Sequence, residues 1–140
     1  MKYMINEGII EIPENLIDRS VNMLMSVDGK KISYTISRDK LQPEEDLNEF
    51  VDRQLKDLSR QVSKFVESDR IEINLKNSPR SGYQINSTFK QNGREFYQRQ
   101  IVVALKDSES ILVVTGTSFA PWTEEEISGW KFMLKNSELK

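Results

Sequence analysis

The residues that could do chemistry in this chain are carboxylates, lysines and tyrosines, because its 140 residues include no histidine and no cysteine. The acidic side chains gather in two clusters, Glu44-Glu45-Asp46 and Glu124-Glu125-Glu126. Neighbouring carboxylates can serve as general acid and general base in catalysis. Each cluster, however, stands where a helix is predicted to begin, and the positive end of the helix dipole stabilises negative charge there. The sequence therefore predicts no catalytic residue.

Cofactor and metal sites are not expected either. Gly116 and Gly129 are isolated glycines, so neither belongs to a glycine-rich phosphate loop. The spacing of an EF-hand calcium loop is missing, and so are the histidines and cysteines that hold zinc. We predict a protein without cofactor or metal that is not an enzyme.

The composition is that of an ordinary soluble domain, with 37% hydrophobic and 30% charged residues and a net charge of −2. This length predicts a single domain spanning residues 1–140. Nucleic-acid binders usually show a basic excess, which is missing here. The N-terminus lacks the apolar region of a secretory signal, and the longest apolar run, Ile101 to Leu105, is too short to cross a membrane. These features, with zero cysteines, predict a cytoplasmic protein.

Alternating polarity and turn residues predict an α+β fold with a mostly antiparallel sheet. The segment Tyr3 to Ile12 is expected to form a strand or hairpin broken near Asn6-Glu7-Gly8. Further strands are expected at Ser20–Val27, Lys31–Asp39, Asp69–Leu75, Tyr83–Gln91, Glu95–Leu105 and Ser110–Ser118. Asp28-Gly29 and Asn92-Gly93 indicate two-residue hairpin turns, Asp107-Ser108 a third turn, and residues 77–82 a loop.

Two helices complete the expected order. The first opens at Pro43 and shows an apolar stripe from Leu47 to Phe65. The last runs to about Asn136, and Thr123 with Glu126 three residues later has the pattern of a capping box. Trp122 and Trp130 are expected to anchor this helix.

Five segments in a fixed order link the chain to a known family. They are Ile5-Asn6-Glu7, Asp18-Arg19-Ser20-Val21-Asn22, Ser37-Arg38-Asp39, Val51-Asp52-Arg53-Gln54-Leu55 and Tyr97-Gln98-Arg99-Gln100. Over nearly its whole length the chain resembles the Eag (effector-associated gene) chaperones of type VI secretion systems, in the DcrB-like superfamily. The resemblance implies a cytoplasmic homodimer with a concave, cradle-like surface. It also implies shielding of the N-terminal transmembrane helices of a PAAR-containing effector before loading onto the secretion spike.

A surface that holds transmembrane helices needs adaptable apolar contacts and a few polar groups that imitate helix packing inside a membrane. Strand parity and helix spacing suggest where such a surface would lie. The candidate client-binding residues are Met23, Met25, Ser33, Thr35, Ser37, Gln54, Leu58, Phe96, Gln98, Gln100 and Val102. Plain structural interpretations stay open for each of them: core positions for the methionines, and a solvated sheet face for the serines, threonine and glutamines.

The arginines of these segments, including Arg38 and Arg53, are expected to be structural, pairing with carboxylates to fix one element to another. A different class of function is also open, since a cavity lined by methionine and glutamine in the same fold could bind a small molecule or a lipid acyl chain. A cradle open between two subunits would favour peptide helices. A closed pocket within one subunit would favour a small ligand.

Overall fold

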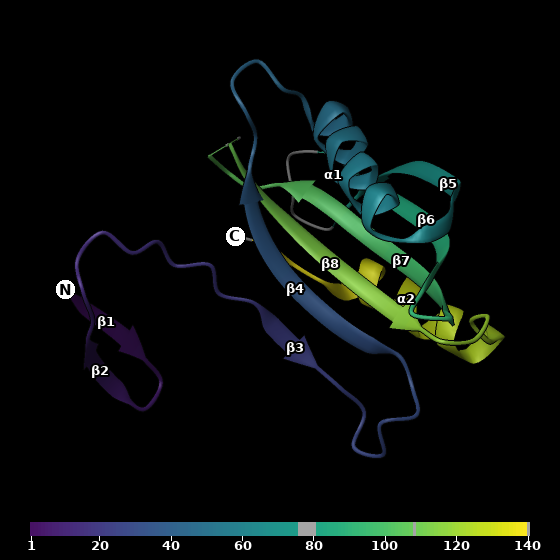
Figure 1. The fold of residues 1–140 in the computed structure, drawn as a ribbon, viewed down its shortest axis with the longest axis horizontal. Helices are drawn as coiled ribbons and strands as arrows, with labels where there is room; N and C mark the ends of the chain where they lie inside the picture. The colour runs from purple at the N-terminus through teal and green to yellow at the C-terminus, as the bar shows by residue number, and fades with distance from the viewer. Residues whose placement is uncertain (76–80, 108, 140) are drawn as a thin grey trace.

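The structure, a computed structural model, describes residues 1–75, 81–107 and 109–139. The elements follow in the order β1 (Lys2–Ile5), β2 (Gly8–Glu11), β3 (Asn22–Leu24), β4 (Ser33–Lys40), α1 (Leu47–Gln61), β5 (Ser63–Asn74), β6 (Ser81–Gln91), β7 (Arg94–Ala104), β8 (Ser110–Ser118) and α2 (Glu124–Asn136) (Figure 1). The expected order of strands and helices is confirmed, and the first segment forms a hairpin rather than one strand.

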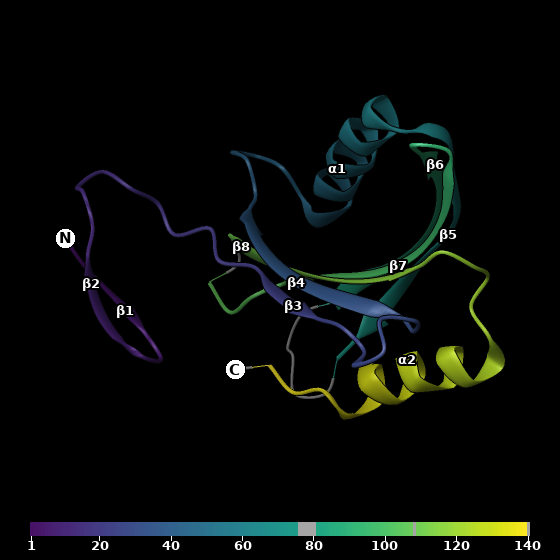
Figure 2. The same ribbon diagram turned by 60° about the horizontal axis from the view of Figure 1, so that its bottom comes forward.

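Six strands form one antiparallel sheet in the order β3-β4-β8-β7-β6-β5. The sheet is strongly curved, with α1 inside the curve and α2 against the opposite side (Figure 2). We call the side that packs against α1 the concave face and the other side the α2 face. The expected α+β class with a mostly antiparallel sheet is confirmed, and the sheet is curved.

Each face of the sheet has its own hydrophobic core, because side chains of one strand alternate between the faces. On the concave face, Phe50, Val51 and Leu55 of α1 pack against Ile85 and Val102. On the α2 face, a second cluster joins these four buried residues: Leu75, Ile101, Val103 and Trp130. Trp130 is fully buried, and its indole N–H donates to Gln84 Oε1 at 3.0 Å, which confirms it as an anchor of α2.

The two predicted hairpin turns have different outcomes. Asn92 and Gly93 both have positive φ, 54° and 75°, and join paired strands in a two-residue turn, as predicted. The prediction for Asp28-Gly29 is wrong, because β3 ends at Leu24 and β4 begins only at Ser33. Asp28 there accepts hydrogen bonds from the backbone N–H of Lys30 and the hydroxyl of Ser26, so the loop satisfies its own polar groups without strand pairing. The turn expected at 107–108 and the loop at 77–82 lie partly outside the described residues.

The first helix is shorter at both ends than predicted, since it begins at Leu47 rather than at Pro43 and ends at Gln61, before Phe65. Asp46 caps α1, and Asp46 and Glu49 exchange hydrogen bonds in a capping box. At the other end Val62 is extended, and β5 then pairs with β6 from Ser63 onward, so Phe65 reaches the concave core from a strand. Pairing with β6 decides this boundary, because apolar spacing alone does not show where a neighbouring strand begins. The second capping box, at Thr123, is confirmed.

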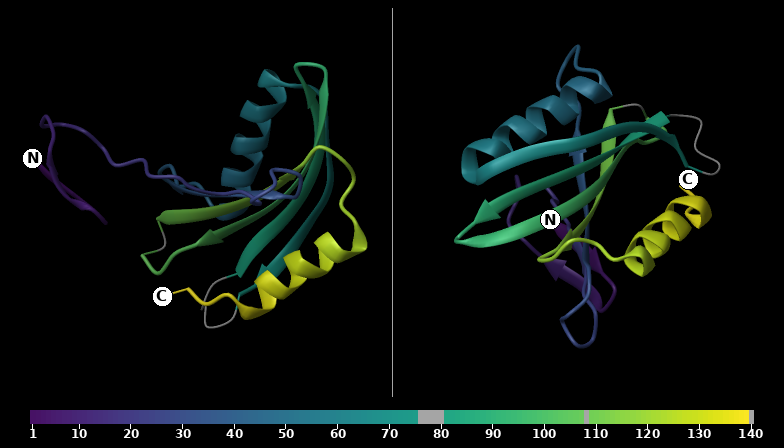
Figure 3. Two further views of the ribbon diagram at one scale, coloured as in Figure 1. Left: turned by 90° about the horizontal axis from the view of Figure 1, so that it is seen from below. Right: turned by 90° about the vertical axis from the view of Figure 1, so that its right-hand side faces the viewer.

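The N-terminal arm, residues 1–21, projects away from the six-stranded sheet (Figures 1 and 3). Its β1–β2 hairpin is a separate two-stranded sheet. Of the sixteen large hydrophobic side chains that are exposed in the described part of the chain, twelve lie within residues 1–27. This end of the molecule therefore has apolar surface that the rest of the chain leaves uncovered. Among the residues described, neither helix is long and apolar enough to cross a membrane.

Candidate functional site

Strand register places polar side chains side by side across the centre of the concave face. Gln100 of β7 pairs with Thr115 of β8, Thr115 pairs with Thr35 of β4, and Thr35 pairs with Met23 of β3. Directly paired residues of antiparallel strands share a face, so these four side chains form one row. The row runs from the buried centre of the sheet to its exposed edge, since Met23 is 65% exposed.

A second row lies beside the first, two residues further along the strands. Ser87, Gln98, Thr117 and Ser33 are paired in turn across β6, β7, β8 and β4. Ser87 is buried, whereas the other three are half-buried. We call the two sets together the polar rows.

Hydrogen bonds inside the polar rows use only part of their capacity. Gln100 Nε2 donates to Thr115 Oγ1 at 3.1 Å, and Gln98 Nε2 donates to Thr117 Oγ1 at 3.3 Å. Among the described residues, the hydroxyl of Ser87 has no hydrogen-bond partner. That hydroxyl is too deeply buried to reach a bound molecule. Gln98 and Gln100 are half-buried and each donates one hydrogen bond, so their remaining amide donor and acceptor groups are available for polar contacts with a bound molecule.

The predicted helix residues lie at the rim of this surface. Gln54 Nε2 reaches Asp39 Oδ2 at 3.4 Å, which links α1 to β4. A cavity of about 120 Å³ lies between α1 and the sheet. Its lining includes the predicted residues Ser37, Gln54, Gln100 and Val102. Leu58, one turn beyond Gln54, is half-buried.

The predicted apolar residues are less uniform than expected. Val102 is buried in the concave core beside Phe50, so most of its surface is already covered. Phe96 shares the concave face but lies near the β6–β7 turn, where its ring stacks on Phe89 at 5.0 Å and meets the edge of Phe119 at 5.1 Å. Phe96 therefore belongs to a separate aromatic cluster at the end of the face.

Met25 does not share a face with Met23, contrary to the parity prediction. Strand β3 ends at Leu24, so the alternation of side chains stops before Met25 is reached. Met25 instead lines a groove on the α2 face together with Leu24 and Tyr34. The methionine pair is therefore divided between the two sides of the sheet.

Three partners in the polar rows were not among the predicted residues: Ser87, Thr115 and Thr117. The sequence does carry a signal for two of them, because Thr115 and Thr117 follow the apolar run Ile111 to Val114 at alternate positions of the same strand. Their role could not be recognised without knowing that β8 lies between β4 and β7.

Ion pairs hold α1 in place over the concave face. Arg53 forms a two-pronged contact with Glu45, with Nε–Oε2 at 2.8 Å and Nη2–Oε1 at 2.9 Å. The hydrogen bonds from Arg53 hold the pKa of Glu45 below its ordinary value. Arg70 of β5 reaches Asp52 of α1 at 2.7 Å and also pairs with Glu67. The expected structural role of Arg53 fits this geometry.

Arg38 also has a structural contact, since its Nη1 donates to Asn22 Oδ1 at 2.6 Å and so ties β3 to β4. Within the described ranges, the acidic side chains form no group of three that could hold a metal ion. The site thus consists of a sheet face with polar rows, a helix rim and an exposed methionine edge.

Comparison with known proteins identifies the family of this chain. The family model described as DcrB matches residues 7–136. The chain belongs to the DcrB family. It is also 26% identical over 118 residues to the protein named Effector EagT6 of Pseudomonas aeruginosa, which covers 82% of this chain and 81% of that protein. The expected assignment to the Eag and DcrB-like proteins is confirmed.

The fold of this DcrB-family protein is shared with a solved structure. The crystal structure of PA94, a Pseudomonas aeruginosa protein of unknown function, superposes with a TM-score of 0.76 at 23% sequence identity. The match covers 100% of this chain and 96% of that one. At this identity, the likeness shows a common fold.

Proposed function

We propose that this DcrB-family protein is a cytoplasmic chaperone of a type VI secretion effector. It binds and shields the effector's N-terminal transmembrane helices before the PAAR-containing effector is loaded onto the secretion spike. The similarity to EagT6 and the match to the DcrB family support the effector-associated role. The same similarity favours a binding function over an enzymatic one.

The polar rows are the observation that supports transmembrane helices as the bound part of the effector. A helix made for the membrane exposes about 20 apolar residues in water, and its few polar contacts in the bilayer are hydrogen bonds from Ser, Thr and Gln side chains. The concave face offers the same groups, with Gln98, Gln100, Thr35 and Ser33 in register and Met23 at their edge. The client would thus exchange membrane-like contacts for similar ones on this face.

The N-terminal arm supports a homodimer as the active form. A two-stranded hairpin alone in water is marginally stable, so β1 and β2 need further packing. Met4, Ile9 and Ile10 of the hairpin are all exposed in the single chain. A second copy of the chain would cover them and would widen the cradle offered to the client.

A small-molecule or lipid-binding module is the alternative function. A groove of about 530 Å³ lies on the α2 face within one chain, and this volume falls in the range of small-ligand sites. The groove is open and carries acidic residues at one wall, which suits an acyl chain less well than a closed apolar pocket would.

Co-expression with a client tests the proposal. The chain would be produced together with the N-terminal apolar region of an effector encoded beside its gene, and the purified material would be measured by light scattering. We expect a soluble complex of two copies of the chain with one client, and an insoluble client when the chain is omitted. A client that stays soluble alone, or that never co-purifies, would contradict the proposal, and mass spectrometry would then look for bound lipid.

A further inference from the structure

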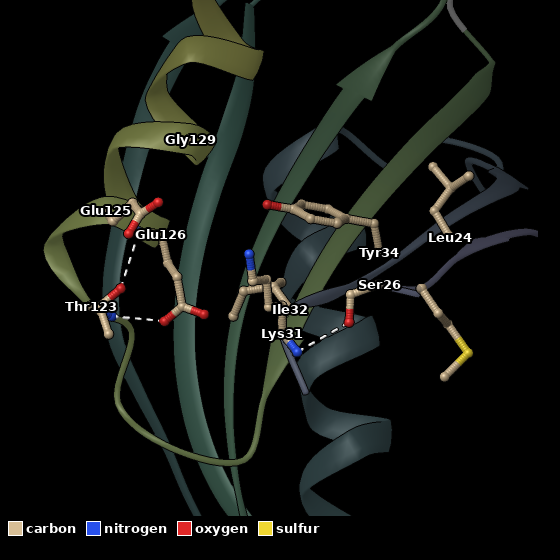
Figure 4. A pocket seen from close by; sticks show the side chains of 10 residues that line it. Leu24, Ser26, Lys31, Ile32, Tyr34, Thr123, Glu125, Glu126 and Gly129 are labelled. Carbon is tan, nitrogen blue, oxygen red and sulfur yellow. Dashed lines mark hydrogen bonds between the residues drawn. The ribbon is translucent and has the colours of Figure 1, made fainter. Parts of the chain in front are cut away.

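A groove on the α2 face lies between the β3–β4 edge of the sheet and the start of α2 (Figure 4). Its apolar floor includes Leu24, Ile32 and Tyr34, and its volume is about 530 Å³. Leu24 and Tyr34 also line an adjoining, almost wholly apolar pocket of about 300 Å³ that reaches Met133. The two pockets therefore form one continuous apolar surface, which we call the outer groove.

One wall of the outer groove is acidic. Glu125 and Glu126 line it from the first turn of α2. Glu126 also accepts a hydrogen bond from the backbone N–H of Thr123, whereas Glu125 has no ion pair within the described part of the chain. Burial, together with the negative charge of Glu126, raises the pKa of Tyr34. Lys31 is the cationic residue among the lining side chains, so carboxylates are in excess.

The outer groove adjoins the polar rows of the concave face around the edge of β3. Met23 faces the polar rows on the concave face, and the next residue, Leu24, faces the outer groove. Met23 and Leu24 are neighbours in the sequence, so a bound polypeptide that crosses the edge of β3 would pass directly from the polar rows to the apolar floor. The acidic wall then lies opposite, across Tyr34, whose hydroxyl points toward α2 (Figure 4).

Resting on the proposed function, we propose that the outer groove binds the basic segment that flanks the client's transmembrane helices. Short segments next to transmembrane helices are rich in Lys and Arg, and they combine these charges with apolar side chains. Such a segment would place an apolar anchor on Leu24 and Tyr34 and a cation against Glu125. The charge complementarity favours association with a cationic partner and disfavours an anionic one.

A second copy of the chain fits this groove less well. Its exposed hairpin belongs to the N-terminal arm. The arm carries four carboxylates and three cationic groups, which are Lys2, Arg19 and the terminal amine. An arm with an acidic excess would be repelled by the acidic wall, so the client segment is the better occupant.

Two fluorescent decapeptides test the groove without a complete client. Each carries two leucines; one has four lysines and the other has four glutamates, with serine elsewhere. We expect fluorescence anisotropy to show the lysine peptide binding roughly tenfold more tightly than the glutamate peptide at low salt. The difference should shrink at 0.5 M salt, because screening weakens exposed charge pairs. Equal binding of the two peptides would overturn the proposal.

Charge reversal on α2 supplies a matched pair of variants. E125K should weaken binding of the lysine peptide about fivefold. E124K changes the same helical turn at a residue that does not line the outer groove, so its effect should be clearly smaller. Equal losses in both variants would show a general charge effect and overturn the site. A change in oligomeric mass for E125K would also overturn it, because the groove would then be covered by a second copy.

A co-expression experiment that measures how much transmembrane helix each chain retains tests the proposed function separately from the outer groove. A transmembrane helix flanked only by serine and glycine would be co-expressed with the wild-type chain and with E125K. Equal retention by both chains, together with the peptide results, supports two distinct surfaces. Failure of the wild-type chain to retain any helix would defeat the shielding function, whereas failure of the peptide discrimination alone would defeat only the outer groove.

Discussion

Gln98 and Gln100 on the concave face each donate one hydrogen bond within the protein, and the rest of each amide group remains available for other hydrogen bonds. Gln100 and Gln98 each donate to a threonine on β8, which orients the side chain before any client is present. Preorientation lowers the entropy lost on binding, because fewer rotamers are frozen at that moment.

Replacing Gln100 with glutamate tests this role at the scale of one residue. Gln100→Glu puts a negative charge among apolar side chains of the client, so retention of a co-expressed transmembrane segment should fall about tenfold or more. The thermal midpoint should change little, since Gln100 is half-buried and can keep its glutamate hydrated in the free protein. Gln91→Glu, on an exposed residue at the β6–β7 turn, is the control and should retain the client fully. Unfolding of the Gln100 variant would instead identify it as a core residue.

At the scale of elements, an ion pair ties the loop after β4 to α1. Glu45 lies just before the helix and Arg53 within it, so their contact closes the loop that follows β4 onto α1. Because Arg53 lowers the pKa of Glu45, the folded state binds a proton less readily at this carboxyl than the unfolded state does. The contribution to stability is therefore fully present above pH 4.5, the ordinary pKa, and is lost as pH falls through the lower folded pKa.

The Glu45→Gln variant should show this pH dependence. At pH 7 we expect it to be less stable than the wild type by about 1 kcal/mol, since the pair is partly covered and two-pronged. The difference should narrow as pH falls below 4.5 and close once pH is below the lowered folded pKa, where the wild-type carboxyl is protonated in both states. Urea denaturation at several pH values measures both. Glu72→Gln, on an exposed residue of β5, should show no such difference, and a gap for Glu45→Gln that does not narrow as pH is lowered would contradict the ion-pair explanation.

The contact between β8 and the segment leading into α2 depends on a glycine. A Cβ atom at Gly116 would lie 2.6 Å from Trp122 Cη2, and the Trp130 ring lies next to the same position. The two indole rings are themselves packed edge to face at 5.6 Å, so they cannot both move aside. Gly116 therefore permits the close approach of both tryptophans to the sheet.

Gly116→Ala should destabilise the protein by about 1–3 kcal/mol, the usual cost of an overpacked core. Gly129→Ala is the matched control, because nothing lies within 4 Å of its added Cβ and the residue is in an exposed helix position. The control should raise stability by about 0.5–1 kcal/mol, since alanine loses less backbone freedom in a helix. The midpoint of urea unfolding gives both values, and a neutral Gly116→Ala would show that Trp122 can move.

At the scale of the whole molecule, the N-terminal arm exposes apolar side chains that no other part of the described chain covers. The hairpin is held by its own strand pairing, and Tyr3 donates to Asp18 Oδ2 at 2.9 Å, but these contacts stay within the arm. Most of the exposed apolar surface lies here and in the β3 region that follows. The proposed second copy gives this surface a partner.

Removing residues 1–17 should therefore convert a dimer into a monomer. We expect light scattering to give the mass of one chain for the truncated protein, whereas circular dichroism should still show the six-stranded sheet, because β3 begins at Asn22. Full-length chain with Glu7→Gln is the control, since this change in the hairpin turn leaves all apolar side chains in place. A truncated chain that remains dimeric would place the subunit interface elsewhere.

Much of the fold follows from local chemistry that can be read in the sequence. Asn92-Gly93 favours φ > 0 at two successive residues, and Thr123 with Glu126 satisfies free backbone N–H groups at a helix start, so both features form where they were predicted. Gln98 and Gln100 lie on the same face of β7 as Phe96 and Val102, as strand parity predicts, because side chains alternate strictly along a paired strand.

The tertiary structure alone decided the features that depend on distant neighbours. The end of α1 at Gln61 depends on pairing between β5 and β6, and the early end of β3 separates Met25 from Met23. Strand order brings Thr115 and Thr117 beside the two glutamines, although 15 and 19 residues separate them along the chain. Local sequence specifies turns, caps and alternation because these involve neighbouring residues. The polar rows depend on which strands lie side by side, and that is determined by packing of the whole chain.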